Sequence, residues 1–323
     1  MTSILTRVKD LKAWSKTTAA DNFKHRMTKK VLAAILSFFR ILIMTGICYI
    51  ILSPLLGILS NAVKDVRDVY NPLVYMIPET FTLANFQNAI SYMDFLPVLL
   101  QTLVFVLVLT GVQILITSMV GYGFARFKFP GNSILFGLMI VTIVVPLHTY
   151  MVPLYMQFRY FLIDFGLNIN LLNNYLSILL LTVTGIGLRS GLYIYIFRQF
   201  FKGLPKEIEE AALIDGAGQM RTFFTVMLPN AMSAIVTVLM FALVWQYNDT
   251  LYASLFIPQI GLMATKLTAL GSTFRSMASV NEPNLVQLVV NAGVVLTLIP
   301  IITIYLAMQR YFMEGIERSG IVG

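Results

Sequence analysis

The strongest constraint on this chain is a set of six long runs that contain no Asp, Glu, Lys or Arg. They cover residues 41–63, 95–125, 129–158, 165–188, 222–248 and 283–309. Each run is long enough for a helix to cross the hydrocarbon core of a membrane, which takes about 20 residues. The runs predict an all-α polytopic membrane protein with six transmembrane helices, at about 33–56, 97–120, 133–155, 175–197, 229–249 and 285–308.

The composition supports a membrane protein over a water-soluble one. The chain is 58% hydrophobic and 12% charged, whereas soluble domains carry about 25% charged residues. The net charge of +8 raises the alternative of a nucleic-acid-binding protein. That function needs a basic face on a folded domain, and here the basic residues lie in short segments between apolar runs. We therefore expect no nucleic-acid partner.

The distribution of basic residues predicts how the chain is oriented. Cytoplasmic segments of membrane proteins are enriched in Lys and Arg. With a cytoplasmic N-terminus, sixteen of these residues fall on the cytoplasmic side and five on the outer side. We therefore expect both termini in the cytoplasm, with residues 1–30 as a basic cytoplasmic segment and 31–323 as the transmembrane domain.

The segment 203–229 is the most informative part between the apolar runs. Pro205 suits the start of a helix, because its missing N–H would be unpaired there. Glu207, Glu209 and Glu210 follow, where the helix dipole favours negative charge. Gly216 suits a helix end. The pattern predicts a helix of about ten residues, followed by a second short helix from Met220 to Val226.

The same segment carries a motif at fixed spacing. It reads Glu210-Ala211-Ala212, then Gly216 after three residues, then Val226-Met227-Leu228-Pro229 after nine more. This resembles the EAA loop of ABC importer permeases, with Val226 in place of the usual Ile. The resemblance implies that Glu210, Ala211, Ala212 and Gly216 couple the permease to an ATPase. It further implies that Asp215 supports the loop and that Leu228 and Pro229 set the angle of the fifth span.

Further motifs resemble the carbohydrate-uptake branch of these permeases, of the MalG-like type. They are Val145-Pro146, Val152-Pro153-Leu154-Tyr155, Phe197-Arg198-Gln199-Phe200-Phe201, Ile214-Asp215-Gly216-Ala217 and Gln309-Arg310-Tyr311-Phe312. In that branch the fifth span usually ends in Trp-Asn-Asp. This chain has Trp245-Gln246-Tyr247-Asn248-Asp249, which is two residues longer.

The resemblance implies a type I importer permease that lies in the plasma membrane of a bacterial cell and forms half of a heterodimer. Its implied partners are a second, MalF-like permease, an ATPase dimer, an extracellular solute-binding protein, a sugar or oligosaccharide and membrane lipids. ATP and Mg would be bound by the ATPase, so no cofactor is expected in this chain.

The sequence contains no catalytic pattern. It has no G-x-x-x-x-G-K-[ST] phosphate loop, and neither of its two His residues lies in a metal-spaced cluster. We therefore expect a non-catalytic subunit. The alternative function is a secondary solute transporter without an ATPase, which needs an ion-coupling site inside the membrane. The acids Asp94, Asp164, Asp249 and Glu282 flank the predicted spans instead.

Polar residues within or beside the spans are candidates for the solute pathway. Arg189 lies in the fourth predicted span between Gly185, Gly187 and Gly191. It lines the pathway or pairs across the interface with the partner permease, or else it extends its charge to the membrane surface from near a helix end. The other candidates are Trp245, Gln246, Asn248 and Asp249. Trp245 could instead be an ordinary interfacial residue, and Asn248 with Asp249 could hold an outer gate.

Overall fold

The computed structural model describes the backbone of residues 2–320, with the side chains of residues 27, 29–163 and 165–310. The chain divides into two compact units, residues 1–60 and 61–323, and each unit is considered by itself. The backbone of residues 2–320 is helical and contains isolated β-bridges but no strand. This confirms the all-α class predicted from the sequence.

The described residues of the first unit, 2–60, all lie in α1 (Thr2–Ala62), which ends two residues into the second unit. Its part from Lys29 to Ala62 is long and apolar enough to cross a membrane. Apolar side chains lie on all sides of this part. A helix that is apolar all round is suited to lipid or to another protein surface.

The second unit contains the remaining helices. They are α2 (Val66–Val69), α3 (Ala84–Met93), α4 (Phe95–Arg126), α5 (Asn132–Val144), η1 (Leu147–Thr149), α6 (Met151–Arg159), η2 (Ile163–Phe165), α7 (Tyr175–Val183), α8 (Ser190–Gly203), α9 (Lys206–Ile214), α10 (Gln219–Thr222), η3 (Phe223–Met227), α11 (Leu228–Asn230), α12 (Met232–Tyr247), α13 (Leu251–Phe256), α14 (Met263–Met277) and α15 (Pro283–Gly320).

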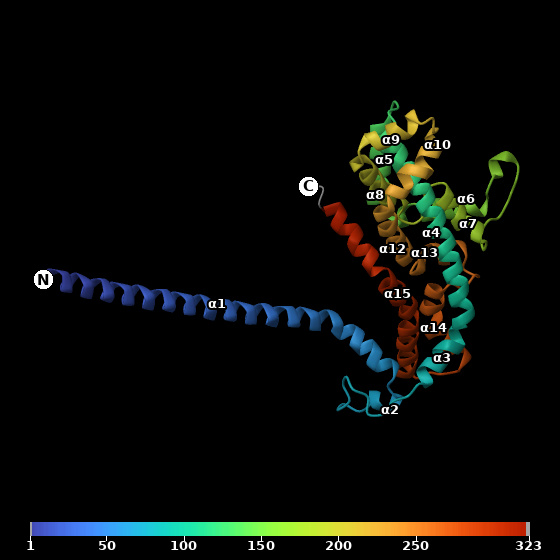
Figure 1. The fold of residues 1–323 in the computed structure, drawn as a ribbon. Helices are drawn as coiled ribbons and strands as arrows, with labels where there is room; N and C mark the ends of the chain where they lie inside the picture. Colours follow the sequence, from blue (N-terminus) through green and yellow to red (C-terminus); the bar gives the residue numbers. More distant parts are fainter. Residues whose placement is uncertain (1, 321–323) are drawn as a thin grey trace. The chain divides into compact units, whose positions relative to one another are not determined.

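The long helix α4 is the centre of this unit. It packs on α7, α8 and α12, and α12 in turn packs on α15. Figure 1 shows α9 and α10 at one end of the unit, and α3 and α14 at the other. Small residues allow the closest approach: a Cβ added to Gly121 of α4 would lie 2.7 Å from the Cβ of Phe197 in α8. The backbones of α4 and α8 therefore lie in direct contact.

The third predicted helix, 133–155, is wrong as a continuous element. The chain leaves α5 at Val145, whose backbone is extended (φ −64°, ψ 121°), and resumes as η1 and α6. Pro146 favours this break, because it lacks an N–H and disfavours the helical region for the residue before it. Apolar composition alone does not reveal such a break.

The fourth predicted helix, 175–197, is also interrupted. The α7 helix ends at Val183 and α8 begins at Ser190, and between them Gly185 and Arg189 both have left-handed backbone (φ 77° and 62°). Arg189 is therefore not inside a helix but immediately before one. The non-helical stretch is rich in glycine, which adopts positive φ at little cost.

The predicted fifth span, 229–249, begins with a sharp bend. The helical stretch from Gln219 to Asn230 meets α12 at an angle of 79°, with the break at Ala231, two residues after Pro229. Within the described residues, three helices are long and apolar enough to span a membrane, and a fourth is added if this bent pair counts as one span. The three helices contain the predicted spans at 33–56, 97–120 and 285–308, and the bent pair covers the predicted span 229–249 as far as Tyr247.

Candidate functional site

The two helix breaks line one cavity of about 580 Å³. Its wall consists of residues 142–148 from the first break, residues 185–192 from the second, and Tyr150, Trp245 and residues 248–251. Irregular backbone at membrane depth is tolerated only where it is buried in protein or lines a cavity. Both breaks lie on the same cavity and so meet this condition.

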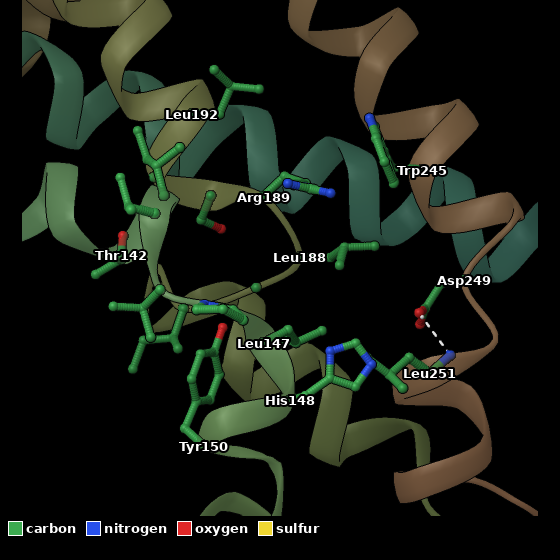
Figure 2. A pocket seen from close by; sticks show the side chains of 18 of the residues that line it. Thr142, Leu147, His148, Tyr150, Leu188, Arg189, Leu192, Trp245, Asp249 and Leu251 are labelled. Atoms are coloured by element: carbon green, nitrogen blue, oxygen red, sulfur yellow. Dashed lines mark hydrogen bonds between the residues drawn. The ribbon is translucent and has the colours of Figure 1, made fainter.

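Four of the five candidate pathway residues line this cavity: Arg189, Trp245, Asn248 and Asp249. Figure 2 shows the Arg189 side chain extended toward the Trp245 ring. The guanidinium carbon lies 4.2 Å from the ring centroid, which is a cation–π contact. The pair connects the break before α8 with the end of α12, across a separation of 56 positions in sequence.

Asn248 and Asp249 have local partners as well as faces on the cavity. The Asn248 amide donates to the carbonyl of Val244 at 2.8 Å. Asp249 Oδ1 accepts from the backbone N–H groups of Leu251 (3.1 Å) and Tyr252 (3.2 Å), at the start of α13. The Asp249 carboxylate therefore shapes the backbone where the chain turns from α12 into α13.

The fifth candidate, Gln246, lies outside the cavity wall. It is buried, accepts from Thr110 Oγ1 at 3.0 Å and donates to Gln113 Oε1, so it joins α12 to α4. Gln113 in turn donates to the carbonyl of Leu188 (2.7 Å) and to Ser190 Oγ (3.0 Å). Leu188 and Ser190 flank Arg189. The buried amide pair, Gln113 with Gln246, therefore holds the backbone at Arg189 in place.

The segment 203–229 forms the helical pair expected from the sequence. The first helix is α9, and Gly216 follows it with a left-handed φ of 83°. The second comprises α10 and a π-helical turn, η3, in place of a uniform short helix from Met220 to Val226. The residues Glu210, Ala211, Asp215 and Gly216 are exposed, and Ala212 is half-buried.

The structure adds a residue that the motif does not contain. Glu209 is buried, with its carboxylate 3.3 Å from Arg126 Nε and accepting from Tyr122 OH at 2.5 Å. Its neighbour Glu210 is exposed. The sequence shows three similar acids in this helix and does not reveal which one faces the protein. Gln113, in contrast, could have been identified as a candidate from the sequence, because it is a polar residue inside a charge-free run.

Comparison with known proteins decides the class of this membrane domain. Residues 113–318, more than half of the chain, match the family described as the binding-protein-dependent transport system inner membrane component. The chain belongs to this family. It is therefore a membrane-embedded permease subunit of a binding-protein-dependent ABC importer, and not a catalytic subunit. This membership favours the importer over the secondary transporter.

Similar permeases extend over most of the chain. It is 26% identical to the arabinooligosaccharides transport system permease protein AraQ of Halalkalibacterium halodurans, over 91% of this chain and 100% of that protein. It is 27% identical to the sn-glycerol-3-phosphate transport system permease protein UgpE of Escherichia coli, over 87% of this chain and 96% of that one.

A solved structure shares the fold of this permease. A chain of a bacterial ABC transporter involved in the import of the acidic polysaccharide alginate superposes with a TM-score of 0.68 and 19% identity. The match covers 86% of this permease and 96% of that chain.

Proposed function

We propose that this permease forms half of the membrane pathway of an importer for a sugar or oligosaccharide, with the cavity as its part of the pathway. The observation that carries the proposal is the Arg189–Trp245 pair on the cavity wall. An aromatic face stacks on a sugar ring, and a guanidinium donates hydrogen bonds to hydroxyl or acidic groups. The oligosaccharide named for the relative AraQ supports this substrate class.

The segment 203–229 is proposed to dock on an ATPase. The surface of α9 and its end presents Ala211, Leu213 and Ile214, and Ile214 is 85% exposed. Exposed apolar side chains beside small ones suit a helix that inserts into a cleft of a partner. ATP and Mg would be held by that partner.

The remaining partners are those that the family implies. The apolar surface of α1 suits lipid and a second, MalF-like permease. An extracellular binding protein would deliver the solute to the opposite side from α9. In this arrangement the two broken stretches, α5 to α6 and α7 to α8, are the third and fourth of six spans, and both termini are cytoplasmic.

The test is made on the complex of this chain with its partner permease, ATPase and binding protein in liposomes. The probes are arabino-oligosaccharides, α-glucosides and acidic oligosaccharides, each tested for stimulation of ATP hydrolysis and for uptake. Glu210→Lys is expected to abolish both, because it reverses the charge on the proposed docking surface. Glu79→Gln, in the loop between α2 and α3, is the control and should leave both unchanged.

Two results would contradict the proposal. If Glu210→Lys supports stimulated ATP hydrolysis at the level of the unsubstituted complex, the segment 203–229 is not the docking site. If no sugar stimulates the unsubstituted complex although all subunits assemble, the proposed substrate class is wrong.

A further inference from the structure

Glu209 and Arg126 join α9 to the end of the central helix α4. The two side chains are 12% and 6% exposed, and the ion pair closes at 3.3 Å. Arg126 Nη2 also donates to the carbonyl of Leu204, in the link between α8 and α9, at 2.8 Å. Because a buried charge without its partner is costly, this pair holds α9 in one position against α4.

The other contact of Glu209 is on the same helix. Tyr122 lies one turn before Arg126, and its hydroxyl donates to the second carboxylate oxygen of Glu209. One carboxylate is thus held at two points of α4. Two attachments one turn apart fix the orientation of the Glu209 side chain relative to α4 as well as its distance from α4. A movement of α9 must therefore turn or shift the end of α4.

The same helix reaches the cavity. Gln113 lies 13 positions before Arg126 on α4, a rise of about 20 Å. It holds Leu188 and Ser190, on either side of Arg189. The helix α4 is uninterrupted between these points (Figure 1), whereas α5 to α6 and α7 to α8 are broken.

We propose that Glu209 is the positioning residue that transmits movement of α9 through α4 to the Arg189 segment of the cavity. The inference rests on the proposed docking function. The two adjacent acids then have different roles. The exposed Glu210 contacts the ATPase, and the buried Glu209 connects the docking helix α9 to the membrane domain. Coupling between distant sites needs a contiguous element that both sites bias, and α4 is attached at both ends.

The experiment measures movement at the cavity without a need to know the solute. In the full complex in liposomes, Cys48 is replaced by Ser and Ile186, an exposed residue of the cavity wall, by Cys. The rate of labelling with a membrane-impermeant maleimide is compared without nucleotide and with ATP plus vanadate. The ratio of the two rates reports how far the ATPase moves the segment before α8.

Four variants are compared in this background: Glu209→Gln, Arg126→Gln, both together, and the exchanged pair Glu209→Arg with Arg126→Glu. The single and double Gln variants are expected to bring the ratio close to unity while the ATPase still co-purifies. The double Gln variant leaves no buried charge unpaired, and co-purification of the ATPase is the check that it is folded. The exchanged pair is expected to recover a nucleotide-dependent ratio. Glu207→Gln, an exposed acid of the same helix, is the control.

The outcomes separate the inference from the proposed function. A full nucleotide response in the double Gln variant would overturn the role of Glu209 and leave docking intact. Failure of the ATPase to co-purify with the unsubstituted permease would remove the docking function, and this inference with it. A loss of co-purification confined to Glu209→Gln would make Glu209 part of the docking surface and would also overturn the inference.

Discussion

The guanidinium carbon of Arg189 lies 4.2 Å from the centroid of the Trp245 ring, on the wall of the cavity between the helix breaks. Arg189 has a left-handed backbone, which is uncommon for a residue with a side chain. Gln113 donates to both of its neighbours and stabilises this backbone. The pair is thus positioned by three elements, α4, α8 and α12, and not by one local turn.

Removal of the Arg189 charge is expected to impair uptake without preventing assembly. Arg189→Ala loses a cation–π contact of about 0.5–2 kcal/mol and any hydrogen bonds to solute. We expect uptake to fall at least about 10-fold, the factor that corresponds to 1.4 kcal/mol. The measurement is the initial uptake rate in liposomes, together with the amount of ATPase that co-purifies.

A matched control removes a similar pair away from the cavity. Arg159 lies 5.3 Å from the ring centroid of Tyr160, so Arg159→Ala also deletes an arginine–aromatic contact. Uptake should be unchanged in this variant. Equal loss in both variants would show that the Arg189 effect is not specific to the cavity.

The contact between α4 and α8 should depend on Gly121. An added Cβ would lie 2.7 Å from Phe197 Cβ and about 3 Å from backbone atoms of Arg198 and Ile194. Backbone atoms cannot rotate away, so Gly121→Ala should cost about 1–3 kcal/mol. The expected result is a lower thermal unfolding temperature of the purified permease.

Gly123 provides the internal comparison on the same helix. A Cβ at Gly123 meets nothing within 4 Å, and alanine favours a helix more than glycine does. Gly123→Ala should therefore unfold at the same temperature or higher. A fall as large as that of Gly121→Ala would show that close packing of α4 on α8 is not the cause.

The buried amide pair should behave as one unit. Gln113→Leu leaves the carbonyl of Leu188 and the hydroxyl of Ser190 without their donor and Gln246 without its acceptor. An unpaired buried group costs about 1–3 kcal/mol. Gln113→Leu and Gln246→Leu should each lower the thermal unfolding temperature. The double variant should lose less than the sum of the two, because residues in one hydrogen-bond network are not additive. Additive losses would mean that the two amides act separately.

The end of α9 should depend on Gly216. Its φ of 83° disfavours a residue with a side chain by roughly 1–2 kcal/mol. Gly216→Ala should weaken solute-stimulated ATP hydrolysis, because the loop that follows α9 changes direction at this residue. Gly218→Ala tests the specificity, since Gly218 has a φ of −70° and open space around it. Unchanged stimulation in both variants would show that the conformation at Gly216 has no part in coupling.

The sequence alone determined the class of protein and the local elements. Charge-free runs longer than a bilayer crossing predict membrane helices because the cost of burying charge in lipid does not depend on the neighbours. The helix α9 and its end at Gly216 follow from equally local rules, the helix dipole and the preference of glycine for positive φ. The segment 203–229 was therefore recognisable before any contact was known.

Only the tertiary structure decided where the runs are broken and what the breaks face. Nothing local shows that Pro146 interrupts the third run while Pro300 lies inside α15, because the difference depends on which neighbours satisfy the freed backbone groups. The pairing of Arg189 with Trp245, and the choice of Glu209 over Glu210 for burial, depend on helices distant in sequence. Contacts across such distances are set by packing, and the order of residues along one helix does not encode them.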